Sequence, residues 1–281
     1  MPRSCRVDSI HIGQGHPLAI ITGPCVLESL DLGLSIGRQM LKACQNAGLP
    51  MIFKASFDKA NRSSITSYRG PGLEQGLQWL ATIGHELNIP ITTDIHEPAQ
   101  AEAIAEVVDL IQIPAFLCRQ TDLLLATGKA ARTRNRAVNI KKGQFLSPEE
   151  MVGPIRKSEQ AGCDNLILTE RGTFFGYHRL VNDFIGVGDL LQLGPPVCFD
   201  VTHSTQLPGS GTQTGGRPER APLLARAATA AGVHALFIET HPDPKNAKSD
   251  GSTVLPLDIA TEVITQAAAI RRALESPENQ Q

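Results

Sequence analysis

Eight short apolar runs recur along the chain, and a segment of helical character follows each one. Such runs, nearly continuous in Ile, Val, Leu and Phe, are typical of strands buried on both faces of a parallel sheet. They occupy residues 18–26, 51–56, 91–96, 110–115, 137–143, 165–172, 197–204 and 235–242. Eight strand–helix units in a chain of 281 residues predict an α/β fold, the closed (β/α)8 TIM barrel.

An open doubly wound sheet is the alternative for the same pattern. It is less favoured because no G-x-G-x-x-G fingerprint follows the first run. We expect one barrel domain over residues 1–281. Within it, 1–16 should form a peripheral extension with a short strand or hairpin at 5–13, and 276–281 a peripheral tail.

Capping residues mark the expected helix boundaries. The first helix should begin at Ser29 or Asp31 and stop at Gly48, because Ser and Asp cap helix N-termini and Gly ends helices. Ser147 followed by Pro148 marks the start of the fifth helix, and the last helix should cover 257–275.

Composition narrows the classes of function. The net charge of −2 gives no basic excess for a nucleic-acid partner, so any cationic site must be local. The first residues lack the apolar core of a signal peptide, and no run is long enough to span a membrane. We therefore expect a cytoplasmic protein without a membrane partner. Its six scattered cysteines should be free thiols, one of which could bind a metal.

Polar side chains end nearly every predicted strand. In TIM barrels the carboxyl ends of the strands surround one mouth, where active sites lie. The residues are Cys25, Lys54, Asp94, Gln112, Lys141, Lys142, Glu170, Arg171, His203, Glu239 and His241. They are expected to converge there.

One group of these residues is cationic. Segment 51–64 presents Lys and Arg, which suit oxyanions, together with neutral donors; its polar members are Lys54, Ser56, Lys59, Asn61, Arg62, Ser63 and Ser64. Lys141 or Lys142 and Arg171 add charge from later strands. A phosphorylated substrate would balance these cations. The alternatives are a solvated basic loop and lysines paired structurally with Glu170 and Asp94.

A second group could bind a metal ion. Cys25, His203 and Glu239 end neighbouring strands of a closed barrel, and Asp250 follows in the next loop. Cys, His and carboxylate ligands suit Zn²⁺, Fe²⁺ or Mn²⁺. Singly, Cys25 could be a core residue, His203 a hydrogen-bonded strand end and Asp250 a turn residue, since no compact ligand motif is present.

Ordered motifs along nearly the whole chain resemble the 3-deoxy-D-manno-octulosonate 8-phosphate (KDO-8-phosphate) synthase family. They are ITGPCVLES, FKASFDKANRSS, TTDIHEP, IQIPAFLCRQTDLL, NIKKGQF, LTERGTFFGY, DVTHSTQLPG and FIETHPDPKNAKSDGSTVLPL. The resemblance implies a barrel, usually tetrameric. It implies condensation of phosphoenolpyruvate with D-arabinose 5-phosphate and water, which gives KDO 8-phosphate and phosphate for lipopolysaccharide biosynthesis.

The resemblance also implies roles for individual residues. Phosphoenolpyruvate would be held by Lys54, Lys59, Lys141 and Arg171, beside Ser56, Gln112 and the Ala115 backbone. Arabinose 5-phosphate would lie on Asn61, Arg62 and Ser63, with Asp94 near its hydroxyls and Phe116 and Arg119 reaching a neighbouring subunit's sugar phosphate. Lys59, His203 and Asp94 are the expected catalytic residues, with Lys59 as a proton donor to the aldehyde oxygen.

The family has a metal-dependent and a metal-free branch, and the latter carries Asn where this chain has Cys25. Cys25, His203, Glu239 and Asp250 match the four ligands of the metal branch, so the resemblance implies one divalent ion per subunit, acting as a Lewis acid or orienting an oxygen. Stretch 126–138 looks longer than usual and should form a loop on the stability face of the barrel.

Two other functions fit parts of the pattern. 3-deoxy-D-arabino-heptulosonate 7-phosphate synthases use erythrose 4-phosphate on the same fold, but their loop typically reads Lys-Pro-Arg-Thr-Ser, whereas this chain has Ala60 and Asn61 before Arg62. A non-catalytic sugar-phosphate-binding barrel is the other. The intact set of cations and ligands argues against it, because binding alone needs no redox-sensitive thiol.

Overall fold

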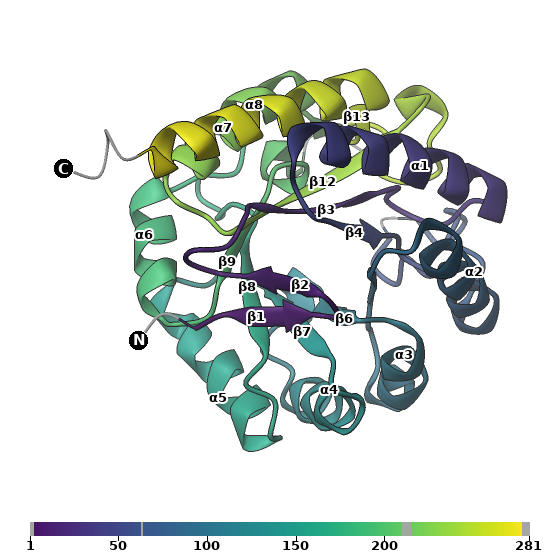
Figure 1. The fold of residues 1–281 in the computed structure, drawn as a ribbon. Coiled ribbons are helices and arrows are strands. Elements are labelled where there is room, and N and C mark those ends of the chain that lie inside the picture. Colours follow the sequence, from purple (N-terminus) through teal and green to yellow (C-terminus); the bar gives the residue numbers. More distant parts are fainter. Residues whose placement is uncertain (1–2, 63, 210–214, 277–281) are drawn as a thin grey trace.

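The computed structural model describes residues 3–62, 64–209 and 215–276, and it confirms the predicted (β/α)8 barrel (Figure 1). Each barrel strand pairs in parallel with the next, and the last strand pairs with both its predecessor and the first. The strands are β3 (Ala19–Gly23), β4 (Met51–Lys54), β5 (Ile91–Asp94), β6 (Leu110–Ile113), β7 (Ala137–Lys141), β8 (Leu166–Glu170), β9 (Val197–Asp200) and β12 (Ala235–His241). This closure excludes the open doubly wound sheet.

Eight α-helices of the described residues surround the strands. They are α1 (Leu30–Ala47), α2 (Leu73–Leu87), α3 (Ala101–Val107), α4 (Thr121–Arg134), α5 (Val152–Gln160), α6 (Phe184–Gln192), α7 (Ala221–Ala230) and α8 (Leu257–Glu275). The first boundary is as predicted: Ser29 Oγ accepts from Leu32 N at 3.2 Å, and Gly48 takes the left-handed conformation that ends a helix, with φ 73°. The fifth helix starts later than predicted, because a 3₁₀ turn over Glu149–Met151 precedes it.

The predicted N-terminal hairpin is present as β1 (Cys5–Val7) and β2 (Ile10–Ile12), which are antiparallel. Figure 1 shows it lying across one end of the barrel. Val7 and Ile12 are fully buried and join a cluster with inward-pointing strand residues such as Ile21 and Phe237. Burying a side chain of this kind stabilises a fold by about 1.5–3 kcal/mol. The amino-terminal end of the barrel is therefore filled with apolar side chains.

Short strands and 3₁₀ turns lie in the loops. They are strands β10 (Gln206–Leu207), β11 (Gly215–Gly216) and β13 (Leu255–Pro256), and 3₁₀ turns at Pro98–Gln100, Ala115–Leu117, His203–Thr205, Pro218–Arg220 and Pro244–Asn246. Three of the 3₁₀ turns, at Ala115–Leu117, His203–Thr205 and Pro244–Asn246, begin two or three residues after the carboxyl end of a barrel strand.

Stretch 126–138 differs from the expected loop. Helix α4 continues to Arg134, and Asn135 ends it in the left-handed conformation with φ 54°. Asn135 and Arg136 connect this helix to β7. The physical reason is that Ala130 and Ala131 are fully buried in a sequence of good helix formers. Most of this stretch is therefore helix.

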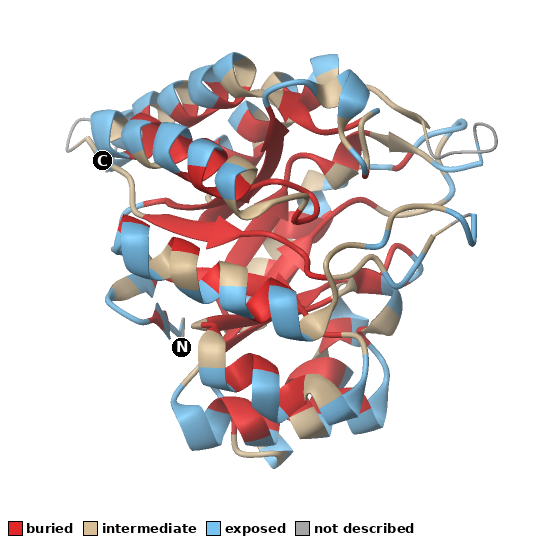
Figure 2. Ribbon diagram, turned by 90° about the vertical axis from the view of Figure 1, so that its right-hand side faces the viewer, coloured by how far each residue is buried: buried red, intermediate tan, exposed pale blue. Residues whose placement is uncertain are grey.

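Burial follows the barrel (Figure 2): the strands are buried throughout, and the helices alternate between buried inner faces and exposed outer faces. The main apolar core lies between strands and helices, with Phe53 and Phe199 among its fully buried side chains. Among the described residues, no helix has the length and hydropathy needed to cross a membrane.

Candidate active site

Buried polar side chains gather at the carboxyl ends of the strands. Their exposed fractions are 0–7%, and groups with so little water contact require partners or ligands. They include Lys54, Asp94, Gln112, Lys141, Glu170, Arg171, Asp200 and Glu239. The predicted convergence of polar strand exits is present.

Three of the four predicted metal ligands form one cluster. Single ligand atoms of Cys25, Glu239 and Asp250 lie within 4.8 Å of one another. The thiol of Cys25 donates to Asp250 Oδ2 at 2.9 Å. His203 Nε2 is 3.5 Å from Glu239 Oε2 and 3.9 Å from Asp250 Oδ2. The fourth predicted ligand thus lies beside two of the others.

The donor set of this cluster fits a cation. Glu239 is fully buried, yet its Oε2 has no hydrogen-bond partner among the described residues. Burial, with the carboxylates of Asp250 and Glu239, raises the pKa of the Cys25 thiol well above its usual value. A divalent ion would satisfy the lone oxygen and favour the thiolate.

Asp200 is a site residue that the sequence analysis missed. Its Oδ2 lies 2.8 Å from His203 Nδ1, and its Oδ1 accepts from His203 N at 2.9 Å. A carboxylate on one ring nitrogen of a histidine orients the other nitrogen toward a ligand. Asp200 is also fully buried at the end of β9. The Asp-x-x-His spacing at a strand end was the available signal.

Two of the predicted phosphoenolpyruvate cations have buried acidic partners. Lys54 Nζ lies 2.5 Å from Glu239 Oε1, and Lys141 Nζ 2.6 Å from Asp200 Oδ2. These two lysines therefore pair with Glu239 and Asp200, whereas the Glu170 pairing that the structural alternative proposed is made by Lys142. Both lysines lie against the Phe237 ring, Lys141 at 3.7 Å from its centroid.

Lys142 differs from Lys141 in its direction. Its ammonium lies 3.3 Å from Glu170 Oε2 and donates to the Leu146 carbonyl at 3.1 Å and to Thr173 Oγ1 at 3.2 Å. Glu170 in turn accepts from the amides of Arg171 and Gly172. Lys142 thus ties two loops together, which leaves Lys141 as the lysine of this strand at the mouth.

Arg171 combines burial with an unsatisfied donor. It is 5% exposed, Nη2 donates to Gln206 Oε1 at 2.5 Å, and Nη1 has no partner among the described residues. Burial lowers the pKa of this guanidinium, and Asp200, Asp250, Glu170 and Glu239 oppose that effect. An arginine remains charged even so. Its free nitrogen is suited to an oxyanion.

Asp94 receives two donors from within the barrel. Ser56 Oγ donates to its Oδ2 at 2.6 Å, Gln112 Nε2 donates to Oδ1, and Lys59 Nζ donates to Ser56 Oγ at 3.2 Å. Burial would raise the pKa of Asp94, but Lys54 and Lys59 outweigh it and the net pKa is lowered. Burial lowers the pKa of Lys59, whereas Cys25, Glu239, Asp94 and Asp250 raise it well above its usual value. Both groups therefore stay charged.

The remaining predicted residues differ in their exposure. Ala115 is buried, Phe116 is 50% exposed and Arg119 is exposed. Asn61 is exposed, and Arg62 is half-buried, while Ser63 lies outside the described residues.

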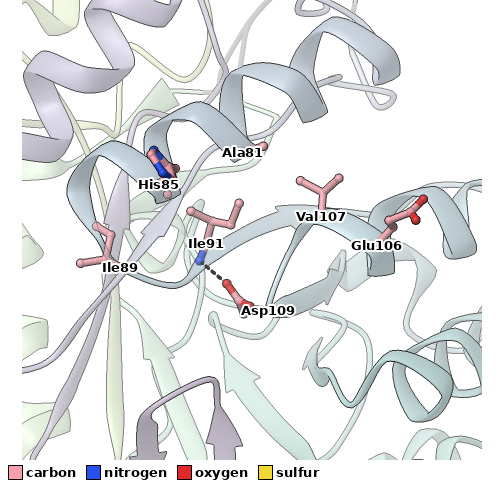
Figure 3. Close-up of a pocket in the computed structure, with 8 residues that line it drawn as sticks. Ala81, His85, Ile89, Ile91, Glu106, Val107 and Asp109 are labelled. Carbon is pink, nitrogen blue, oxygen red and sulfur yellow. Dashed lines mark hydrogen bonds between the residues drawn. The ribbon is translucent and has the colours of Figure 1, made fainter.

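The cavities elsewhere do not compete with this site. One, of about 320 Å³, lies where α2 and α3 end and β5 begins (Figure 3). One of its two acidic residues, Asp109, accepts from Ile91 N at 3.0 Å and pairs with Arg136 at 2.8 Å. Another, of about 990 Å³, adjoins the segments before β3 and after α1. Both lie toward the apolar amino-terminal end, away from the cluster of charges.

Comparison with known proteins matches residues 3–273 to the DAHP synthetase I family. The chain is 49% identical over 271 residues to the 2-dehydro-3-deoxyphosphooctonate aldolase of Syntrophotalea carbinolica, covering 96% of each chain. It is 50% identical to the protein of that name from a Cyanothece species, covering 94% of this chain and 96% of the relative. For Hahella chejuensis the identity is 51%, over 95% and 94% of the two chains.

Proposed function

The chain belongs to the DAHP synthetase I family and, within it, to the 2-dehydro-3-deoxyphosphooctonate aldolases, and from its site we propose how it works. The reaction is the condensation of phosphoenolpyruvate with D-arabinose 5-phosphate and water, which gives KDO 8-phosphate and phosphate. The family resemblance seen in the sequence agrees with these relatives. The chain is therefore an enzyme that forms a carbon–carbon bond and breaks a C–O bond of phosphoenolpyruvate.

One observation carries the assignment of the mouth to this chemistry. Two buried atoms of oppositely charged groups have no hydrogen-bond partner within the described part of the chain: Arg171 Nη1, and Glu239 Oε2, which lies 3.5 Å from His203 Nε2. A buried polar atom without a hydrogen bond is costly, so the free protein is poised for an anion at the first atom and a cation at the second. Phosphoenolpyruvate and a divalent metal ion meet these two needs.

The cations of the mouth position phosphoenolpyruvate. We assign Arg171 and Lys141 to its anionic groups, with Lys54 and Lys59 nearby. Holding two small substrates together supplies a large share of catalysis by such enzymes. C3 of phosphoenolpyruvate then attacks the aldehyde carbon of the sugar, and water adds at C2 and gives up a proton, which offsets the proton that the aldehyde oxygen takes up. Phosphate leaves as the C2–O bond breaks. The same fixed cations stabilise the negative charge that develops.

Proton transfer is assigned to Lys59. The surrounding acids keep its ammonium charged, so it holds a proton that can pass to the aldehyde oxygen as the new bond forms. Ser56 positions the ammonium, since Lys59 Nζ donates to Ser56 Oγ at 3.2 Å. Asp94, fixed by its two donors, faces the sugar hydroxyls as an acceptor.

A divalent ion would be held by Cys25, Glu239 and Asp250, with His203 as the fourth ligand and Asp200 orienting its ring. Bound there, it would supply Lewis acidity toward an oxygen of the substrate or of water. Zn²⁺, Fe²⁺ and Mn²⁺ all suit this donor set.

Assembly as a homotetramer is part of the proposal. Large apolar side chains are exposed near the mouth and in the loop after β8, with Phe116 at 50%, Phe175 at 94% and Tyr177 at 92%. Exposed apolar side chains of this size favour a protein interface. Phe116 and Arg119 would reach the sugar phosphate of a neighbouring subunit. A cytoplasmic location remains a prediction.

Phosphate release tests the reaction. The protein should release phosphate from phosphoenolpyruvate only when arabinose 5-phosphate is present, and far more slowly with erythrose 4-phosphate. Equal rates with the two sugars would contradict the assignment, because the protein would then catalyse the heptulosonate synthase reaction equally well. No release with either sugar would indicate a binding protein.

A further inference from the structure

A chain of side-chain hydrogen bonds runs around the inside of the barrel to Asp94. Thr169 Oγ1 donates to Asn139 Oδ1 at 2.6 Å, and Asn139 Nδ2 donates to Gln112 Oε1 at 3.1 Å. Gln112 Nε2 then donates to Asp94 Oδ1. All four side chains are buried, with Asn139 and Thr169 fully enclosed.

Strand register places these residues side by side. Asp94 on β5 is the partner of Gln112 on β6, and Gln112 is the partner of Asn139 on β7. Thr169 lies on the next strand, β8. This series of hydrogen bonds thus crosses four consecutive strands, and Thr169, the register partner of Lys141, lies two residues beyond the partner of Asn139.

The Asp94 carboxylate, at the end of this series of hydrogen bonds, fixes the direction of every bond in the series. An ionised carboxylate is only an acceptor, so Gln112 must turn its NH₂ group toward Asp94. Its oxygen then faces Asn139, which must donate with its own NH₂ group. That leaves the Asn139 oxygen facing Thr169, whose hydroxyl donates to it. No amide can turn over without placing two acceptors or two donors together in a buried site.

We propose that Asn139 and Thr169 are positioning residues of the condensation reaction. They act through Gln112: Asn139 donates to the Gln112 oxygen and Thr169 donates to the Asn139 oxygen, which keeps the Gln112 amide in place beside Asp94 and gives the substrates a fixed edge. The inference rests on the proposed function, because it assumes that Gln112 and Asp94 face phosphoenolpyruvate and the sugar. Neither Asn139 nor Thr169 has to touch a substrate.

The strongest test is a pair of substitutions at Thr169. Thr169→Val keeps the shape of the side chain but removes the hydroxyl that fixes the Asn139 amide. Thr169→Ser keeps the hydroxyl and removes a methyl group. We expect Thr169→Val to lower kcat/KM about 10-fold or more, since small displacements of a positioning group cost up to ~100-fold. Thr169→Ser should retain most of the wild-type value even if it melts at a lower temperature.

A second substitution, at Asn139, changes the same series of hydrogen bonds. In Asn139→Asp the new carboxylate cannot donate to the Gln112 oxygen, and it competes with Asp94 for the Gln112 NH₂ group. We expect a larger loss of kcat/KM than in Thr169→Val, on the order of 100-fold. If this variant does not fold, the Thr169 pair alone decides the matter.

The readouts separate positioning from plain core packing. A wild-type protein that releases no phosphate with arabinose 5-phosphate would refute the proposed function itself. With an active wild type, unchanged kinetic constants in Thr169→Val would overturn the positioning role, whatever its melting temperature. The expected result is a loss of kcat/KM in Thr169→Val and its recovery in Thr169→Ser.

Discussion

Arg62 reaches across the mouth of the barrel to Ser249: its Nη1 lies 2.8 Å from Ser249 Oγ, and its Nη2 donates to the Lys248 carbonyl at 2.8 Å. These bonds join the loop after β4 to the loop after β12. Ser249 Oγ is in turn 3.3 Å from Asp250 Oδ2. The arginine assigned to the sugar phosphate is therefore linked to the loop that carries a proposed metal ligand.

Replacing Arg62 should mainly affect use of the sugar. In Arg62→Ala we expect kcat/KM for arabinose 5-phosphate to fall by an amount that corresponds to roughly 2–4 kcal/mol, on the scale of truncated charged pairs. KM for phosphoenolpyruvate should change less. Steady-state kinetics with each substrate varied in turn measures both.

Arg38→Ala is the matched control, because Arg38 forms an exposed ion pair with Glu86 on the outer helices. It should leave both constants near wild type. Equal losses in the two variants would show that the effect does not come from the sugar-phosphate site.

Asp200→Asn tests the residue that the sequence analysis missed. The amide cannot balance Lys141, and it holds His203 less firmly than the carboxylate that contacts both. We expect kcat/KM to fall about 10- to 100-fold, as for other partners of metal-binding histidines. Circular dichroism should first verify folding, since breaking a buried pair costs about 3–5 kcal/mol.

The control for this change is Asp109→Asn at the opposite end of the barrel (Figure 3), where Asp109 pairs with Arg136 at 2.8 Å. Asp109→Asn should keep wild-type kcat/KM. An Asp200→Asn enzyme that is folded and fully active would remove Asp200 from the site.

The sequence predicted the barrel because the alternation of apolar runs and helical segments is visible in each local stretch of the chain. Each apolar run such as 137–143 had to be a strand buried on both faces, and each cap such as Ser29 marked its own helix. The strand order then followed from closure. Helix α4 was misjudged at its end because its alanines are buried by partners that the sequence does not reveal.

The sequence predicted which residues lie at the ends of strands, but not which of their side chains pair with one another. Lys54 and Cys25 could be placed at one mouth, whereas the choice of Glu239 as the partner of Lys54 depends on side-chain directions across the closed barrel. Asp200 looked like an ordinary strand residue before its contacts with Lys141 and His203 were known. The roles of Asn139 and Thr169 depend on register between strands.

Metal dependence should follow from the Cys25 thiolate. A strong chelator should abolish activity, and added divalent metal should restore it. Affinity for the metal should fall as pH decreases, because Cys and His must lose protons to bind. Cys25→Ala should lose both metal and activity, whereas Cys25→Asn, which places the residue of the metal-free branch there, should regain some chelator-resistant activity.

Cys163→Ala is the control, since Cys163 is a buried thiol before β8 at the opposite end of the barrel. It should keep the metal content of the wild type. The metal hypothesis fails if unmodified protein, shown by elemental analysis to be free of metal, turns over at its full rate.

The assembly proposal predicts that Arg119 acts in a neighbour's site. Arg119→Ala should impair catalysis without changing the melting temperature, because the side chain is exposed and only its carbonyl bonds to Lys157, at 3.0 Å. Arg156→Ala, an exposed arginine of α5, serves as the control. Sedimentation should show a tetramer, and a fully active monomer would refute the role.

His234 should make the fold sensitive to acid, far from the mouth. Burial, aided by Arg271, lowers the pKa of His234 from 6.5 to about 4, and Nδ1 accepts from Val197 N at 3.1 Å. The unfolded chain therefore binds a proton at higher pH than the folded one, so stability is complete above about 6.5 and is lost as pH falls toward 4. The shift corresponds to at most about 3 kcal/mol, and partial exposure reduces this to roughly 1–2 kcal/mol.

His234→Asn keeps an acceptor but cannot titrate, so its melting temperature, measured at fixed protein concentration, should fall less between pH 7.5 and 5 than that of the wild type. Parallel curves for the two proteins would show that His234 is not the acid-sensitive group.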